Sequence, residues 1–259
     1  MKKNSSKLIV CLLLNVICIS VMAQKDIYEI RTYLLKSEDQ VQATDQYLKD
    51  AYLPAMHRLG FHSIGVFKPL ANDTAAIKKI YVLVTYPSVD NWRKTKISLQ
   101  NDKQYQSAAK PFAEADTNKL PFSRIESALL EAFPDHIKLT PPSIKVNGET
   151  IYELRSYESP TDMLHFKKVT MFNKGGEIVL FKRLDFNAVF YAEVLSGGHL
   201  PNLMYMIVFE NSASREAHWK SFGAAPEWKK LTADPFYESN ISVSHIDSIL
   251  MHRTEYSDL

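Results

Sequence analysis

The sequence predicts an α+β fold in which two tandem ferredoxin-like (βαββαβ) repeats pack sheet against sheet to form a barrel within one chain. Three observations support this prediction. The segment Ile27–Tyr33 recurs as Ile151–Tyr157. Hydrophobic periodicity within each copy gives the order β-α-β-β-α-β, the ferredoxin-like order. The third predicted strand of each copy is a nearly continuous apolar run, which requires burial on both faces.

The repeat extends beyond the opening strands. Five matched segments occur in the same order at nearly constant spacing: Ile27–Tyr33 with Ile151–Tyr157, Arg58-Leu59 with Arg183-Leu184, Tyr81–Val84 with Tyr205–Val208, Trp92 with Trp219, and Ile125–Ser127 with Ile246–Ser248. Internal repeats of this kind define the fold before any single element does. We expect a first repeat over residues 24–134, a linker over 135–148 that contains Pro and Gly turn chemistry, and a second repeat over 149–259.

The elements of the first copy follow from local signals. A strand over 28–34 precedes the capping box Ser37–Gln40, which starts a helix with apolar residues at helical spacing. Pro54 should kink this helix and Gly60 should end it. Strands are expected over 61–67, 80–86 and 124–130, with a second helix that opens at Asp90.

The second copy repeats this order. We expect strands over 152–157, 188–195, 203–209 and 242–251, a first helix capped by Ser159–Asp162 and interrupted at Gly175-Gly176, and a second helix near 215–222. The helices of each copy would cover one face of its sheet, and the sheet of the sister repeat is the nearest cover for the other face. The result would be a closed or nearly closed barrel.

Residues 1–23 have the pattern of a secretory signal peptide. A basic start with Lys2, Lys3 and Lys7 precedes an apolar run from Leu8 to Met22 and a small-x-small cleavage site before Gln24. The run is shorter than the roughly 20 residues that span a bilayer. We therefore expect an exported protein, periplasmic or extracellular, without stable membrane insertion.

Charge and cysteine content exclude several function classes. Removal of the three signal lysines from 31 basic and 29 acidic residues leaves a formal charge of −1, so no basic excess points to nucleic acid. Both cysteines, Cys11 and Cys18, lie in the signal segment. The remaining chain can form no disulfide, thiolate metal site or cysteine nucleophile. The histidines lack strong metal-binding spacing, so we expect no metal and no cofactor.

Five segments of the second copy stand out: Tyr152–Tyr157, Phe181–Leu184, Pro201–Met206, His218–Phe222 and Pro226–Lys229. Together they resemble the NIPSNAP family of the dimeric α/β-barrel superfamily. The first copy keeps the opening strand and Trp92 but has Lys103-Gln104-Tyr105 in place of Pro-Glu-Trp. The resemblance implies the barrel fold. It leaves the chemistry open, because the superfamily includes cofactor-free monooxygenases, haem peroxidases and small-molecule binders.

The opening strands provide the first candidate site. Glu29 and Arg31 alternate onto one face of a central strand, and Glu153 and Arg155 repeat the arrangement. Buried charges are costly unless they are paired. These residues therefore either line a ligand cavity or form a structural charge network.

Other candidates lie near helix ends. Arg58 and Arg183 could clamp a carboxylate or phosphate, or could bond the last carbonyls of the preceding helix. Trp219 could stack on a ligand or belong to the core. His57 and His62 could converge across a helix-to-strand turn, although isolated histidines are commonly surface or satisfied residues.

These patterns support three functional hypotheses. The first is non-covalent binding of a small anionic or amphipathic molecule in a barrel-associated cavity between sheet and helices. The second is a cofactor-free oxygenase- or lyase-type enzyme that uses Arg31 or Arg155 with a nearby histidine or tyrosine base. The third is a scaffold or assembly module that forms a homo-oligomer.

Overall fold

Eight strands form one closed barrel in the computed structural model, which describes residues 24–259. The order around the barrel is β1-β3-β2-β8-β5-β7-β6-β4, and neighbouring strands are antiparallel. The strands are β1 (Ile27–Leu35), β2 (Gly65–Pro69), β3 (Lys78–Tyr86), β4 (Arg124–Ala132), β5 (Ile151–Glu158), β6 (Asn187–Ser196), β7 (Asn202–Phe209) and β8 (His245–Arg253). The predicted signal peptide lies outside the described residues.

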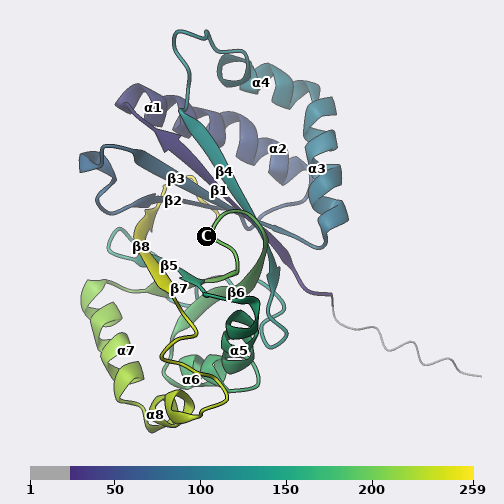
Figure 1. Ribbon diagram of the computed structural model, residues 1–259. Helices are drawn as coiled ribbons and strands as arrows, with labels where there is room; N and C mark the ends of the chain where they lie inside the picture. The colour runs from purple at the N-terminus through teal and green to yellow at the C-terminus, as the bar shows by residue number, and fades with distance from the viewer. Residues whose placement is uncertain (1–23) are drawn as a thin grey trace, which may run out of the picture.

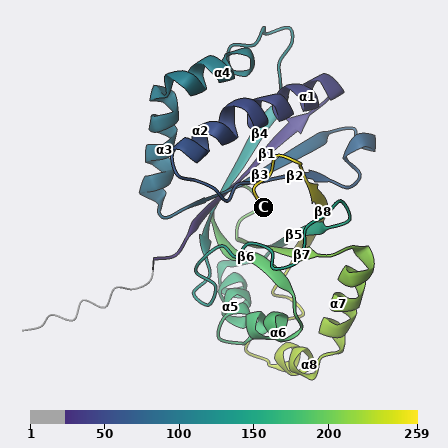
Figure 2. The ribbon, with the colours of Figure 1, turned by 180° about the vertical axis from the view of Figure 1, so that it is seen from behind.

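Helices cover the outside of the barrel in two groups. The first repeat contributes α1 (Glu38–Tyr47), α2 (Leu53–Arg58), α3 (Val89–Asn101) and α4 (Lys103–Ala113). The second contributes α5 (Asp162–Phe172), α6 (Glu177–Arg183), α7 (Ser212–Ala224) and α8 (Pro226–Ala233). Figures 1 and 2 show the two groups on opposite sides of the barrel. The predicted tandem barrel is confirmed.

Alternation along β1 and β5 divides each strand between two cores. Tyr28 and Ile30 belong to a cluster inside the barrel, whereas Ile27 and Tyr33 belong to the cluster under the helices of the first repeat. A strand buried on both faces has apolar residues in both registers. The structure therefore explains the continuous apolar runs.

Aromatic contacts inside the barrel join the two repeats. Tyr28 packs against Phe190 of the second repeat at a ring-centroid distance of 5.0 Å. Tyr152 packs against Phe67 of the first repeat at 4.8 Å. Each opening strand thus completes its packing with the second strand of the other copy.

Two seams close the barrel between the repeats. The β4–β6 seam pairs Leu130 with Val194, and the β2–β8 seam pairs Phe67 with Arg253. The segment after β8 reinforces the second seam, because the backbone N–H of Val66 donates to Ser257 Oγ at 2.9 Å. The barrel can close only when strands from both repeats are in place.

Several elements differ from the sequence predictions. Strand β2 begins at Gly65 instead of residue 61, because the preceding backbone bonds to the C-terminal segment, with Ile64 N–H donating to Asp258 Oδ2 at 3.0 Å. The sequence predicts a kink at Pro54, whereas the structure has a π-helical segment, Leu48–Tyr52, directly before α2, and Pro54 lies in the first turn of α2. Helices α4 and α8 follow the second helix of each repeat and were not expected from the sequence.

Within residues 24–259, no helix combines the length and apolar character that crossing a bilayer requires.

Candidate functional site

Glu153 is the centre of a buried hydrogen-bond network between β5 and α7. Its carboxylate has no exposed surface and accepts five hydrogen bonds, from Arg155 Nη1 (2.7 Å), Arg215 Nε and Nη2 (2.7 and 2.9 Å), Trp219 Nε1 (2.9 Å) and Ser248 Oγ (2.6 Å). Burial alone would raise the pKa of Glu153. The hydrogen bonds and the charge of Arg155 outweigh it and lower the pKa to about 2. The carboxylate is therefore an ionised structural anchor.

Glu29 occupies the equivalent position in the first repeat with fewer donors. It accepts from Arg31 Nη2 at 3.1 Å, Ser127 Oγ at 2.9 Å and the Tyr86 hydroxyl at 3.3 Å. Burial opposes ionisation, but the charge of Arg31 and the bond from Ser127 lower the pKa of Glu29. Both Glu-x-Arg pairs face the helices. They form a structural charge network, which is one of the two alternatives that the sequence left open.

Arg155 extends the network of the second repeat into an aromatic cluster. Its guanidinium lies 4.6 Å from the Trp219 ring centroid, and its Nε donates to the Tyr157 hydroxyl at 3.1 Å. Trp219 therefore combines core packing with polar contacts. Near this cluster, Lys168 and Glu177 form a buried ion pair at 2.9 Å.

Arg58 and Arg183 make equivalent contacts in the two repeats. Arg58 Nε donates to Asp102 Oδ2 at 3.2 Å, and Arg183 Nη2 donates to Glu227 Oε2 at 2.9 Å. Each arginine thus binds a carboxylate at the start of α4 or α8. Arg58 and Arg183 thus form ion pairs with acids 44 residues further along the chain, instead of the bonds to helix carbonyls considered from the sequence.

His57 and His62 converge as expected, with stacked rings 5.3 Å apart. His57 Nε2 also lies 3.0 Å from Asp258 Oδ2 in the C-terminal segment. His62 lines a surface cavity of about 340 Å³ beside the start of β1, together with Asp26 and Lys138.

A larger cavity, of about 480 Å³, opens at the end of the barrel where β1 and β5 finish. Both repeats contribute to it. Its polar lining residues include Thr32, Lys79, Glu126, Ser156, His199, Asn202 and Asp247, and its apolar lining residues include Ile30, Leu154, Met204 and Ile249. We call this space the barrel-mouth cavity. Its apolar part is continuous with the barrel core, to which Ile30 and Leu154 belong.

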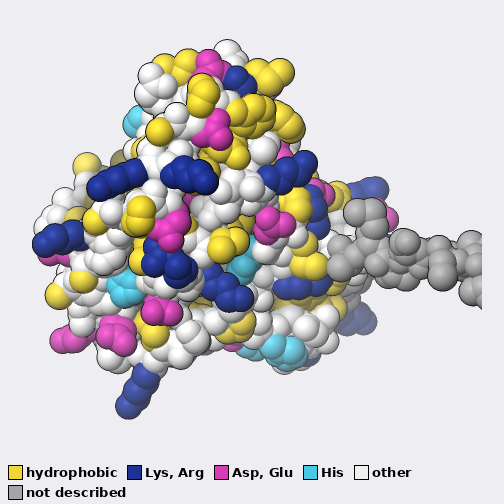
Figure 3. Space-filling view, turned by 90° about the horizontal axis from the view of Figure 1, so that it is seen from below, with side chains coloured by type: hydrophobic (Ala, Val, Ile, Leu, Met, Phe, Trp, Pro, Cys, Tyr) yellow, Lys and Arg dark blue, Asp and Glu magenta, His cyan; other side chains and the backbone are white. Residues whose placement is uncertain are grey.

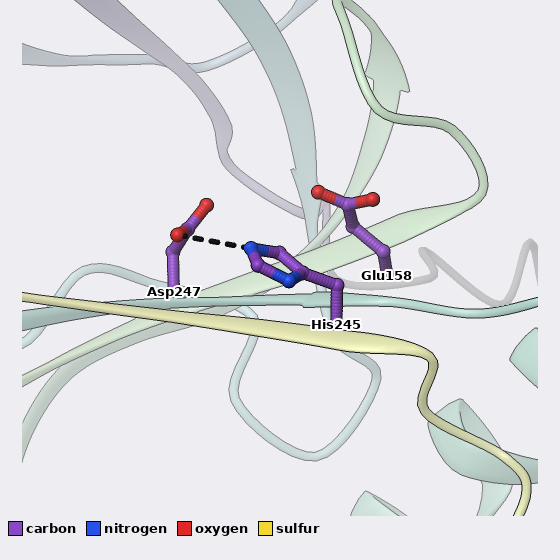
Figure 4. A group of neighbouring side chains, drawn as sticks. All are labelled: Glu158, His245 and Asp247. Carbon is purple, nitrogen blue, oxygen red and sulfur yellow. Dashed lines mark hydrogen bonds and ion pairs between the residues drawn. The ribbon is translucent and has the colours of Figure 1, made fainter.

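Three side chains of types that can bind a metal ion meet beside this cavity, and one of them, Asp247, lines it. Glu158 ends β5, and His245 and Asp247 begin β8 (Figure 4). Each offers a ligand atom, and these atoms lie within 4.8 Å of one another. His245 Nε2 is 3.2 Å from Asp247 Oδ1, and His199 Nδ1 is 3.0 Å from Glu158 Oε1. We call Glu158, His245 and Asp247 the rim cluster.

His136, in the linker, lines another cavity of about 340 Å³ with Tyr191 and Lys182. Burial lowers the pKa of His136, although a hydrogen bond with the Val189 carbonyl opposes this effect. A neutral imidazole beside a cavity can accept a proton from a bound molecule.

The outer face of the second repeat carries charged and hydrophobic side chains that are intermingled (Figure 3). Exposed apolar side chains there include Met163, Phe166 and Val179.

Neither the barrel-mouth cavity nor the rim cluster is predicted by the sequence. The cluster depends on the β5–β8 register, which pairs Glu158 with His245 and Ser156 with Asp247. The alignment of the two copies did contain one signal of the rim cluster. His245 aligns with Arg124, so this histidine is specific to the second copy.

Comparisons with known proteins agree with this architecture. Residues 152–258 match the NIPSNAP family model. A candidate monooxygenase of Fusobacterium nucleatum is 8% identical, with a TM-score of 0.58 over 90% of this chain and 94% of its own. One from Lactobacillus acidophilus is 12% identical, with a TM-score of 0.57 over 88% and 94%. An anthrone oxidase-like protein is 11% identical, with a TM-score of 0.51 over 89% and 92%. These likenesses establish the fold. Among curated proteins, none matches the sequence significantly.

Proposed function

We propose, from the premise that the second repeat is a NIPSNAP domain within a dimeric α/β barrel, that the protein binds a small amphipathic molecule in the barrel-mouth cavity. The observation that carries the proposal is the cavity itself, which has a polar rim above an apolar wall. Its volume of about 480 Å³ falls in the usual range for small-molecule sites, roughly 300–1,000 Å³.

The lining favours one of the two ligand classes expected from the sequence. Glu126 and Asp247 are carboxylates, and Lys79 is the one lysine among the cavity residues. A ligand with a neutral or cationic polar end suits this rim better than an anion does. Its apolar end would contact Leu154, Met204 and Ile249.

A cavity-filling substitution tests the site. Met204→Trp adds a bulky ring to the wall of the cavity, whereas Met163→Trp places the same ring on the exposed surface of α5. Titration with the neutral dye Nile red should give saturable fluorescence at one dye per wild-type chain. We expect Met204→Trp to weaken this binding at least tenfold and Met163→Trp to leave it unchanged.

Two results would overturn the assignment. One is the absence of saturable binding, and the other is equal dye affinity in the folded Met204→Trp variant and the wild type. Mass spectrometry of the purified protein adds a second readout, because a co-purified small molecule should be lost in Met204→Trp alone.

A second candidate function is cofactor-free oxygenase- or lyase-type catalysis with His136 as the base. The lowered pKa of His136 and its place beside a cavity with Tyr191 support this candidate. Oxygen consumption with a hydroquinone as substrate would test the oxygenase form. His136→Gln should abolish turnover, and turnover at the wild-type rate would exclude His136 as the base.

Export and self-association complete the proposal. The signal-like pattern of residues 1–23 supports delivery to the periplasm or the exterior, which fractionation of expressing cells would test. Light scattering of the purified protein would establish whether it forms a homo-oligomer.

A further inference from the structure

The rim cluster combines three donors of the kinds that hold transition-metal ions. We propose that Glu158, His245 and Asp247 bind a divalent transition-metal ion of the zinc type at the mouth of the barrel. Zinc accepts histidine nitrogen and carboxylate oxygen at about 2.0–2.2 Å, so two ligands in a tetrahedral site are about 3.4 Å apart. The ligand atoms of the cluster lie within 4.8 Å of one another, so they must approach by at most about 1.4 Å to hold one ion.

The backbone supports this convergence. Glu158 and His245 are directly paired across β5 and β8, and Asp247 follows two residues along the same face of β8. Residues on one face of adjacent strands have neighbouring side chains. The ligands are thus attached to paired strands of a closed barrel rather than to a loop.

The charge around the cluster also favours a cation. Among residues 24–259, the ion pairs of Glu158 and Asp247 are formed with histidines alone, His199 and His245. A divalent ion bound between Glu158 and Asp247 would balance both carboxylates.

The donor set indicates the class of ion. Magnesium and calcium prefer oxygen ligands alone, whereas an imidazole with carboxylates suits zinc and similar transition ions. His199, which lies 3.0 Å from Glu158, would orient that carboxylate from outside the metal. His245 and Asp247 are more than half exposed, which leaves room for water or another ligand on the ion.

The first repeat shows that the barrel does not require this cluster. Its equivalent positions hold Leu34 and Arg124, which are paired in the same way across β1 and β4, and Glu126. One apolar residue and one cation cannot form a metal site. The donor set is therefore a feature of the second repeat alone.

Calorimetric titration of the purified, chelator-treated protein with zinc chloride tests the proposal. We expect one zinc ion per chain. His245→Ala and Asp247→Asn should each weaken binding at least tenfold. His252→Asn removes an exposed histidine near the other end of β8 and should leave zinc affinity unchanged. If His245→Ala fails to fold, Asp247→Asn still tests the proposal. Asparagine has the same shape as aspartate and Asp247 is exposed, so this variant should fold.

Thermal unfolding gives an independent readout. Zinc should raise the melting temperature of the wild type and of His252→Asn, but not of His245→Ala or Asp247→Asn. Wild-type zinc affinity in the folded His245→Ala and Asp247→Asn variants would overturn the proposal, as would the absence of stoichiometric binding. Met204→Trp should still bind zinc, so failure of organic-ligand binding and failure of metal binding are separable.

Discussion

At the scale of single residues, the two Glu-x-Arg pairs show how the same motif can be stabilised to different degrees. Glu153 accepts hydrogen bonds from two arginines, a tryptophan and a serine, whereas Glu29 accepts from one arginine, a serine and a tyrosine. Charge-assisted hydrogen bonds are the stronger kind, and removal of one member leaves buried partners unpaired. The second repeat should therefore depend more on its glutamate.

We predict that Glu153→Gln lowers the free energy of unfolding by about 3 kcal/mol at pH 7, and Glu29→Gln by less. The folded pKa of Glu153, about 2, lies below its ordinary value of 4.5. Its ionisation therefore stabilises the fold above pH 4.5, and this contribution disappears as the pH falls towards 2. The stability gap between wild type and Glu153→Gln should narrow by about 2 kcal/mol between pH 7 and pH 3.

Urea unfolding at the two pH values measures this gap. The exposed Glu149, replaced by Gln, is the control and should leave stability nearly unchanged. A gap of equal size at both pH values would show that the charge of Glu153 is not the cause.

The sequence predicted that each glutamate and arginine share a strand face, because period-two alternation is a local property. The sequence alone did not determine whether these side chains line a ligand cavity or form a closed hydrogen-bond network. That distinction depends on Arg215 and Trp219, which α7 brings to Glu153 from more than 60 positions along the chain. Contacts of this range follow from tertiary packing and not from a local pattern.

At the scale of elements, local side-chain caps fix the N-termini of α1, α3, α5 and α7. Ser37, Ser88, Thr161 and Asn211 each accept a backbone hydrogen bond at a helix N-terminus. The first repeat lacks the proline that starts α8, yet α4 begins at the equivalent place because Asp102 accepts from the backbone N–H of Tyr105 at 2.9 Å. A different cap thus preserves the same element.

We predict that Gly176→Ala destabilises the protein by about 1–2 kcal/mol, because Gly176 has φ +91° where α5 gives way to α6. Space is not the cause, since an added Cβ there meets no atom within 4 Å. Gly148→Ala is the matched control, because that site is equally open and lacks the left-handed backbone. Melting temperatures of the two variants give the comparison, and equal values would refute the backbone explanation.

At the scale of the whole molecule, the repeats depend on each other for burial. Tyr28 and Tyr152 complete their packing on Phe190 and Phe67 of the other copy. The sequence predicted this arrangement correctly, because a central strand with apolar residues in both registers needs covers on both faces. It did not predict the barrel-mouth cavity, whose shape depends on side chains from both repeats.

We predict that residues 24–134 and residues 149–259, produced separately, do not form stable monomers. Each fragment would expose its half of the barrel core and two unpaired seam strands. Light scattering and circular dichroism of each fragment, and of the two mixed, provide the measurement. A monomeric fragment with cooperative unfolding would contradict the prediction, whereas recovery of native spectra on mixing would support it.

The β2–β8 seam has a further consequence for the order of folding during synthesis. Strand β2 leaves the ribosome long before β8, so its outer edge has no partner until almost the whole chain has been translated. Pairing of residues so distant in sequence also carries a loop-closure cost that slows folding. Barrel closure should therefore be a late kinetic step, and a chain paused before β8 would retain an open strand edge with unpaired backbone groups.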